Sequence, residues 1–307
     1  MNDNSQGHLS RVAIIIAAVV GCGGQGAASE SSAVPAVPRL KVAVAQPLVV
    51  PGDVAQNIRA MEPLVVEAAR RGAQLVLFSE CGITGYDLKG VGAAAALTLE
   101  DAALERIATL ARANSVVIVA GLNERRNGQL HNTAVAFFPD GRRVVQRKHH
   151  IMDQEQKVAP VVPGGRSRTI FEVCGFRCAV LICSDDGMPG IYEELAAAGC
   201  HVVLLPTAGA GSVSLGFHQR ELADPARRQK FLDAAVPCLS REGVERSIVR
   251  QIAVAACNQM GWNERTGYFH PGGSSIVDRS GEVTAVIPPR FVFEHLRPDL
   301  AVGLVSR

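Results

Sequence analysis

Three side chains of different chemical type each follow a segment that predicts a β-strand. They are Glu80, Lys148 and Cys183, which lie far apart in the chain. The ends of strands in an α/β protein face a common crevice, so these side chains can converge there. A thiol nucleophile, a carboxylate base and a fixed cation are the groups that acyl transfer through a thioester requires. The pattern therefore indicates thiol-based acyl-transfer chemistry.

Cys183 has the most informative local sequence. The run 177–182 predicts a buried strand, and Pro189 with the alanine-rich stretch to residue 198 predicts a helix soon after it. A helix N-terminus favours negative charge, so we expect this setting to favour the thiolate. Asp185 and Asp186 would oppose ionisation unless they cap the helix. A lone cysteine would more often be a small apolar core residue, so the partners decide the interpretation.

Each partner alone would be uninformative. Glu80 comes directly after the apolar run 75–78, where a carboxylate beside the core can act as a base toward a thiol. By itself it would more often be a helix cap or a surface charge. Lys148, after the strand predicted over 142–146, would more often be solvated. The combination of three complementary groups at three strand ends favours a catalytic role.

Composition restricts the protein class. The chain has 307 residues, 48% hydrophobic and 20% charged, enough to bury one large α/β core. The formal net charge is +2 and the basic residues are scattered, so nothing indicates a nucleic-acid partner.

The segments alternate between β and α types, with hairpins in the middle. Asn127-Gly128 and the Pro-Asp-Gly sequence at 139–141 are turn signals. Thr98 with Asp101 resembles a capping pair for a helix through residue 112. We expect two mostly buried sheets with helices outside. The strands are predicted at 41–45, 75–78, 116–120, 132–138, 142–146, 177–182, 202–205, 252–256, 275–277 and 283–287, and the first helix at 54–68.

The N-terminal region resembles a secretion signal. Residues 12–20 are wholly apolar, too short to span a membrane but as long as a signal-peptide core. Val-Val-Gly-Cys at 19–22 resembles the lipobox of bacterial lipoproteins, which makes Cys22 a lipidation candidate. We expect a signal peptide at 1–21, a flexible tether at 22–38 and the folded domain at 39–307. The expected location is extracytoplasmic, lipid-anchored to a bacterial membrane. The alternative is a short buried helix or a disordered start on a cytoplasmic protein.

The remaining cysteines and histidines do not indicate a metal site. No two of the eight cysteines have the paired spacing of structural zinc ligands. Cys174 and Cys178 could face each other across a hairpin, as a disulfide or as core filling. His149 and His150 lack a carboxylate or cysteine at ligand spacing, so we interpret them as loop residues.

With these residues in place, the sequence resembles the nitrilase superfamily of carbon–nitrogen hydrolases, from about residue 41 to 287. The family's glutamate segment resembles Leu-Val-Leu-Phe-Ser-Glu at 75–80, its lysine segment Arg-Lys-His-His at 147–150, and its cysteine segment Leu-Ile-Cys-Ser-Asp at 181–185. The family's second glutamate best matches Glu155. Asn258 and the Gly-Gly-Ser-Ser hairpin at 272–275 match its closing section.

The resemblance implies a fold and roles for residues. It implies a four-layer α-β-β-α sandwich, commonly paired into homodimers across the cysteine-bearing helices. Glu80 would be the base, Cys183 the nucleophile, Lys148 the oxyanion-stabilising cation and Glu155 the residue that orients Lys148. No metal or organic cofactor would be needed. The remaining expected oxyanion or substrate contacts are Ser184 through its backbone N–H, Tyr86, Thr207 and Asn258.

The expected substrate is a small-molecule amide. Ser184 and Asp185 follow the nucleophile, whereas family members that act on nitriles typically carry tryptophan and glutamate there. Two alternatives remain: an acyltransferase that uses the same thioester, and a non-catalytic binding lipoprotein with the same fold. The only membrane contact expected is through the lipid anchor.

Overall fold

The computed structural model describes residues 37–87, 89–208, 250–263, 268–290 and 297–307. By its internal contacts the chain divides at residue 36, and Val37–Arg307 forms one compact unit. The predicted signal peptide, tether and lipidation site at Cys22 lie outside the described residues. Most of the segment 207–240, which follows the strand predicted at 202–205, also lies outside the described residues.

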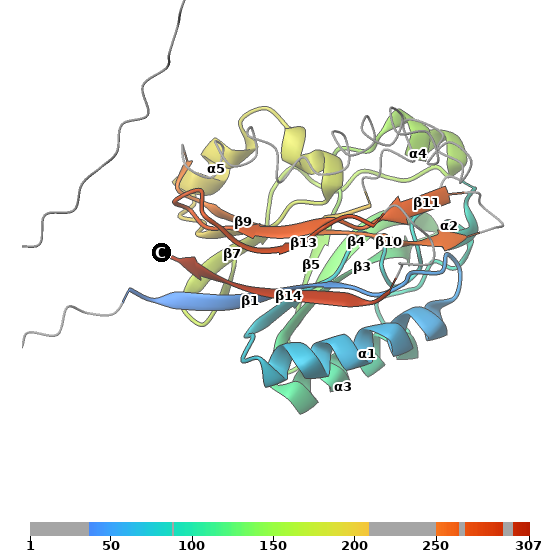
Figure 1. Cartoon of the computed structure of the whole chain (residues 1–307). Helices are drawn as coiled ribbons and strands as arrows, with labels where there is room; N and C mark the ends of the chain where they lie inside the picture. The colour runs from blue at the N-terminus through green and yellow to red at the C-terminus, as the bar shows by residue number, and fades with distance from the viewer. Residues whose placement is uncertain (1–36, 88, 209–249, 264–267, 291–296) are drawn as a thin grey trace, which may run out of the picture. The chain divides into compact units, whose positions relative to one another are not determined.

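Two six-stranded sheets form the centre of this unit (Figure 1). The first has the order β14 (Asp299–Ser306), β1 (Arg39–Gln46), β2 (Leu75–Leu77), β3 (Val117–Arg126), β4 (Gln129–Phe137) and β5 (Arg143–Arg147). The second has the order β13 (Val283–Ile287), β12 (Ser274–Val277), β9 (Ala253–Asn258), β8 (Val202–Thr207), β7 (Phe176–Val180) and β6 (Phe171–Val173). A two-stranded ribbon joins β10 (Met260–Asn263) to β11 (Tyr268–Pro271).

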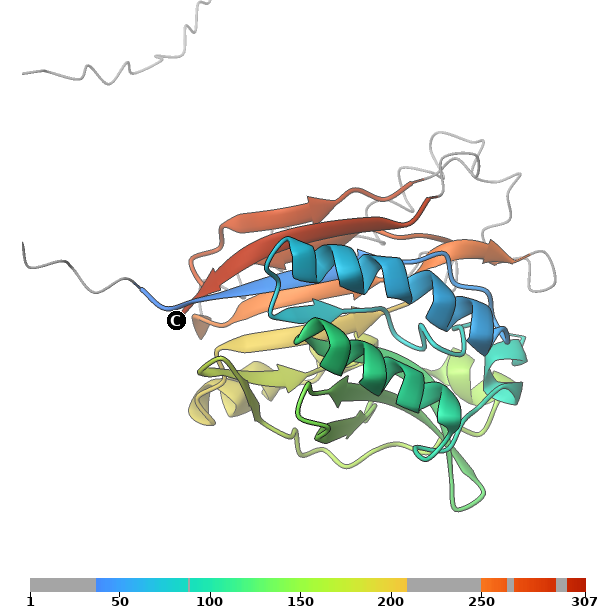
Figure 2. The ribbon, with the colours of Figure 1, turned by 90° about the horizontal axis from the view of Figure 1, so that it is seen from below.

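Helices cover the outer faces of the two sheets. In Figures 1 and 2, α1 (Val54–Arg70) and α3 (Ala102–Asn114) lie together over the first sheet, and Figure 1 shows α5 (Ile191–Ala197) on the opposite side, over the second. Short helices α2 (Val91–Ala94) and α4 (Asp153–Val158) and a 3₁₀ turn at Cys183–Gly187 lie in the connections. The predicted α-β-β-α sandwich is confirmed.

Alternation along the buried strands builds the layers. In β8, Val202 and Leu204 enter the core between the sheets, whereas Val203 and Leu205 join the cluster that contains α5. Because successive strand residues point to opposite faces, a strand covered on both faces must be apolar throughout. That is why these strands appear in the sequence as continuous apolar runs.

The long helices follow local signals. Asp53 caps α1 by accepting from the Gln56 backbone N–H at 3.0 Å, as its place before the apolar stripe predicts. The capping pair predicted for α3 is wrong in detail. Asp101, not Thr98, is the N-cap, and its side chain accepts from the Ala103 N–H at 2.8 Å.

The structure resolves the alternatives for Cys174 and Cys178. Both are free thiols; Cys174 lies in the exposed turn between β6 and β7, and Cys178 is buried opposite Phe171. Cys178 therefore fills the core. No helix in the described part of the chain has the length and apolarity that a bilayer span demands.

Gly121 lets β3 approach the segment that carries Glu80. A Cβ at this position would lie 2.4 Å from the Cys81 nitrogen and 2.9 Å from the Ser79 carbonyl oxygen. Those distances are far below van der Waals contact, so a methyl group must displace the backbone next to Glu80.

We therefore expect Gly121→Ala to destabilise the fold by about 1–3 kcal/mol, as overpacking of a core does. Thermal unfolding measures this. Gly165→Ala is the matched control, because a Cβ there meets nothing within 4 Å. An unchanged midpoint for Gly121→Ala would show that the close approach is not a constraint.

Candidate active site

The sandwich brings the candidate residues together at the ends of strands. Glu80 follows β2, Lys148 directly follows β5, and Cys183 begins the 3₁₀ turn after β7. The Glu80 backbone N–H also reaches the Thr207 carbonyl oxygen at 3.4 Å, which links this segment to the end of β8 in the other sheet. The crevice expected from the sequence therefore contains groups from both sheets.

The centre of the site is the ammonium group of Lys148. Its Nζ lies 2.7 Å from Glu80 Oε1 and 3.0 Å from each carboxylate oxygen of Glu155. Lys148 is 0% exposed and Glu80 1% exposed, so this ion pair is shielded from water. A buried ammonium without partners would be very unfavourable. Two carboxylates in contact compensate for its desolvation.

Burial and charge act in opposite directions on this cluster. Burial alone would lower the pKa of Lys148, but the negative charges of Glu80 and Glu155 raise it well above its usual value. Burial raises the pKa of Glu155, while Lys148 opposes that shift. Lys148 is therefore a permanent cation at neutral pH.

Two local interactions hold Lys148 and Glu155 in place. Arg147, next to Lys148, makes a bidentate ion pair with Glu124 at 2.6 and 2.7 Å. Glu155 lies in the first turn of α4 and accepts from the Met152 backbone N–H at 2.9 Å. Paired contacts of this kind restrict rotation of the side chains.

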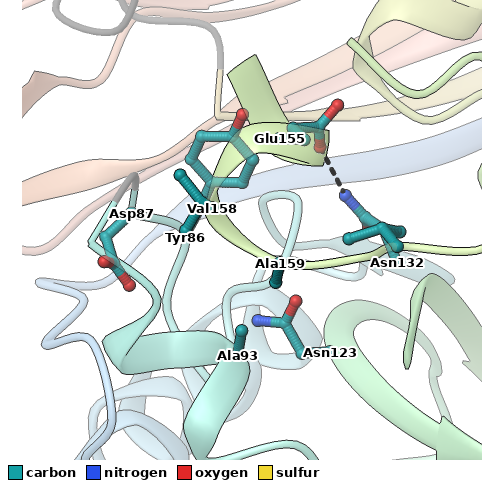
Figure 3. Close-up of a pocket in the computed structure, with 9 residues that line it drawn as sticks. Tyr86, Asp87, Ala93, Asn123, Asn132, Glu155, Val158 and Ala159 are labelled. Atoms are coloured by element: carbon teal, nitrogen blue, oxygen red, sulfur yellow. Dashed lines mark hydrogen bonds between the residues drawn. The ribbon is translucent and has the colours of Figure 1, made fainter. Parts of the chain in front are cut away.

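Glu80 is held by further donors. The Ala208 backbone N–H donates to Oε2 at 2.8 Å, and the Asn132 side-chain amide donates to Oε1 at 2.8 Å. The same amide nitrogen lies 3.4 Å from Glu155 Oε1, the contact drawn in Figure 3. Asn132 is a contact that the sequence reasoning missed, because the residue was considered only as part of a hairpin.

The environment of Cys183 differs from the one predicted. Burial raises the pKa of the thiol, and so does the nearby charge of Glu80; the charge of Lys148 opposes the shift. The expectation that a helix N-terminus favours the thiolate is wrong. The residue starts a 3₁₀ turn, and α5 begins only at Ile191. The thiol is therefore neutral at rest and needs a base.

Cys183 also has a constrained backbone. Its φ is +49°, in the left-handed region that non-glycine residues rarely adopt. Such conformations persist where the surrounding structure enforces them. The chain therefore leaves the extended conformation of the strand at Cys183, where the 3₁₀ turn begins.

Asp185 enforces part of this geometry. The carboxylate is fully buried and accepts from the backbone N–H groups of His149, His150 and Ile182 at 3.0, 2.8 and 3.2 Å. The guanidinium of Arg168 lies 3.3 Å from it. One side chain thus ties the segment after Lys148 to the segment of Cys183. Asp185 caps the 3₁₀ turn through the Ile182 N–H and not the predicted helix α5, whose N-cap Gly190 has no side-chain hydrogen bond.

Ser184 and His150 fix the peptide next to the nucleophile. The Ser184 hydroxyl donates to the His150 carbonyl oxygen at 2.7 Å, and His150 Nδ1 lies 3.1 Å from the Ser184 carbonyl oxygen. The hydroxyl therefore has a structural partner. An oxyanion contact from the Ser184 backbone N–H stays a prediction.

The other predicted substrate contacts lie in the same region. Tyr86 is 8% exposed, burial raises its pKa so that it stays a neutral phenol, and it lines a cavity of about 30 Å³ with Asn132 and Glu155 (Figure 3). The Thr207 hydroxyl donates to Asn258 Oδ1 at 3.1 Å, and Asn258 Nδ2 donates to the Gly272 carbonyl oxygen at 2.7 Å. These bonds link strand ends, and a role in substrate binding stays a prediction for all three.

Metal ligation has no support among the placed side chains. Within the described residues, no three His, Cys, Asp or Glu side chains come together in an arrangement that could hold a metal ion. His149 Nδ1 lies 2.8 Å from the Gly164 carbonyl oxygen, a contact between two loops.

Comparison with known proteins gives a consistent result. A family model described as carbon-nitrogen hydrolase matches residues 41–291. The chain is 27% identical to omega-amidase NIT2 of Xenopus tropicalis over 239 residues, which cover 75% of this chain and 78% of the relative. It is 28% identical to an aliphatic nitrilase of Sinorhizobium fredii over 266 residues, covering 80% and 82%.

The fold also matches solved structures. A mutant amidase from Nesterenkonia sp. AN1, solved in complex with butyramide, superposes with a TM-score of 0.70 at 24% identity and covers 88% of this chain and 94% of that one. Another structure of the amidase from Nesterenkonia sp. gives a TM-score of 0.70 at 23% identity, covering 91% and 94%.

Proposed function

The chain belongs to the carbon–nitrogen hydrolase family, and from that premise we propose that it hydrolyses a small-molecule, non-peptide amide through a thioester on Cys183. The observation that carries the proposal is the buried Lys148 between Glu80 and Glu155, with Cys183 close enough for the charges of Glu80 and Lys148 to act on its thiol. Base and cation are in contact and the nucleophile lies near both, as acyl transfer requires.

The first step is attack by sulfur. The thiol is neutral at rest, so its proton must move to Glu80 as the sulfur–carbon bond forms. The carbonyl π electrons move to oxygen, and the resulting oxyanion is stabilised by Lys148 and the Ser184 backbone N–H. The raised pKa of the Cys183 thiol is consistent with proton transfer during attack, because the sulfur keeps its proton until the substrate is in place.

The proton on Glu80 then completes acylation. As the tetrahedral intermediate collapses, the carbon–nitrogen bond breaks and the amine leaves with that proton. Glu80, again a carboxylate, takes a proton from water as the water oxygen attacks the thioester. Collapse expels the Cys183 sulfur, which takes the proton back. The sum is amide plus water giving carboxylic acid plus amine.

Lys148 can serve the oxyanion while it holds both carboxylates. An ammonium group has three N–H donors. One faces Glu80 Oε1 at 2.7 Å, and the equal 3.0 Å distances to the two Glu155 oxygens fit a single shared N–H. One donor is then left for the substrate, and Glu155 orients it.

Amides are favoured over nitriles for two reasons. Ser184 and Asp185 follow the nucleophile, whereas family members that act on nitriles typically carry tryptophan and glutamate there. An amide also needs its leaving amine protonated, and Glu80 receives the thiol proton for that step. Among the relatives, both omega-amidases and nitrilases occur, so the preference needs a direct test.

We expect wild-type protein to release ammonia faster from short aliphatic amides than from the matching nitriles, for example propionamide against propionitrile. Cys183→Ala should abolish release from both while its thermal midpoint stays close to wild type, because one small side chain at a crevice is lost. Cys174→Ala, at an exposed cysteine, is the matched control and should keep full activity. Faster release from nitriles across several pairs would refute the amide assignment, and a tenth of the activity in Cys183→Ala would refute the covalent step.

We expect Lys148→Gln to reduce kcat by about 10²–10³-fold with little change in KM, the loss seen when one oxyanion donor is removed. Steady-state kinetics on the best amide measures it. Lys157→Gln, at an exposed lysine on the same helix as Glu155, should have wild-type kinetics. A loss confined to KM would make Lys148 a substrate-binding residue only.

We also propose that the enzyme is an extracytoplasmic lipoprotein anchored through Cys22. The support is the sequence Val-Val-Gly-Cys at 19–22 after an apolar run. Pairing into a homodimer stays a prediction from the family resemblance.

Expressed in a bacterium with its own N-terminus, the wild-type protein should partition into detergent. Cys22→Ser should release it or block processing, whereas Cys174→Ser should not. A soluble wild-type protein whose intact mass still includes Met1 or Asn2 would contradict the anchor.

A further inference from the structure

We propose that Asn132 is a positioning residue that fixes the Glu80 carboxylate for proton transfer with Cys183. The inference rests on the proposed function, in which Glu80 is the base. The neutral amide of Asn132 orients two carboxylates without adding charge to the cluster.

Asn132 contacts all three charged members of the cluster. Its Nδ2 donates to Glu80 Oε1 at 2.8 Å and lies 3.4 Å from Glu155 Oε1. Its backbone carbonyl oxygen accepts a hydrogen bond from the backbone N–H of Lys148 at 2.8 Å. The residue is 3% exposed and lies within β4, so its position is set by the sheet. Figure 3 shows its amide directed at Glu155.

Counting the lone pairs of Glu80 shows what this bond does. Each carboxylate oxygen offers about two acceptor sites. On Oε1 both are occupied, by Lys148 Nζ at 2.7 Å and Asn132 Nδ2 at 2.8 Å. On Oε2 one is occupied by the Ala208 backbone N–H at 2.8 Å. One site on Oε2 is left for the thiol proton. Without Asn132, one site on Oε1 would be open as well, and the carboxylate could rotate.

The orientation of the amide is defined by charge. If the group were flipped, Oδ1 would face two carboxylate oxygens, which is repulsive. In the observed orientation Oδ1 is buried with no hydrogen-bond donor within reach among the described residues. A buried unpaired acceptor is unfavourable, and such groups are uncommon outside functional sites. The charge-assisted bond to Glu80 offsets that penalty.

A neutral donor suits this position better than a cation would. A second positive charge beside Glu80 would stabilise its ionised form and reduce its affinity for the thiol proton. The amide donates a directed hydrogen bond with no net charge. Lys148 then remains the single cation that contacts both Glu80 and Glu155 among the residues described.

The chain offers a matched control in Asn123. It is the direct cross-strand partner of Asn132 on β3, and it lines the same small cavity. Its Nδ2 donates instead to the Thr84 hydroxyl at 3.0 Å and the Gly85 carbonyl oxygen at 3.3 Å. Removing either amide creates a similar small cavity, but only one change affects Glu80.

We expect Asn132→Ala to lower kcat by about 10–10²-fold with KM within about threefold, since the defect lies in proton transfer. The acidic limb of the kcat/KM profile should move to higher pH, because a hydrogen bond to the ionised carboxylate is lost. Asn123→Ala should keep the wild-type limb and kcat within about threefold. Asn132→Asp, which keeps the size but replaces the neutral donor with a third carboxylate, should lose at least as much kcat as the alanine variant.

The rate of Cys183 alkylation by iodoacetamide at neutral pH gives a readout that needs no substrate. It should fall several-fold in Asn132→Ala and Asn132→Asp but not in Asn123→Ala. If wild type hydrolyses no amide but the alkylation rates of the Asn132 variants still fall below that of Asn123→Ala, the proposed function fails and the role of Asn132 stands. Wild-type kcat and pH profile in either Asn132 variant, or equal losses in Asn132→Ala and Asn123→Ala, would overturn the inference.

Discussion

A single ammonium ion, enclosed by protein between two carboxylates, is the interaction on which the rest of the site depends. Lys148 has no access to water, so its charge is tolerated only while Glu80 and Glu155 contact it. This requirement fixes the relative positions of three parts of the chain: the segment after β2, which carries Glu80, the end of β5, which leads to Lys148, and the short helix α4, which carries Glu155. Burial and the charge of Glu80 keep the Cys183 thiol protonated, so the reactivity of the sulfur depends on transfer of its proton to Glu80.

Such a cluster needs a rigid scaffold, and the sandwich supplies one. The central strands of both sheets are covered on both faces, so they cannot shift register without exposing apolar side chains. Close backbone approach at Gly121 places the Glu80 segment against β3. Asp185, with Arg168 as its counter-ion, binds the backbone on both sides of the crevice. Catalytic geometry is thus built from main-chain contacts, which side-chain motion disturbs little.

The sequence predicted what depends on local pattern. Buried strands are continuous apolar runs, which located the ends that carry Glu80 and Cys183, and the turn signals located the central hairpins, one of which leads to Lys148. What depends on distant packing was not predictable. The contacts of Asn132 appear only when the fold brings β4 close to α4 and to the segment after β2, and the thiol environment of Cys183 depends on burial between the sheets. Strand β14 was missed as well; it contains Gly303, where a Cβ would lie 2.5 Å from the Thr284 hydroxyl, a long-range contact without local signal.

The central claim, that hydrolysis passes through a thioester formed on the enzyme, can be tested by partitioning with hydroxylamine. An amide, an anilide and an ester of one acid should give the same acyl-enzyme, so at a fixed hydroxylamine concentration the ratio of hydroxamate to free acid should be identical for all three. The ratio should also rise with hydroxylamine concentration, because the added amine competes with water for the thioester. A ratio that changes with the leaving group, or free acid formed without hydroxamate, would contradict the account.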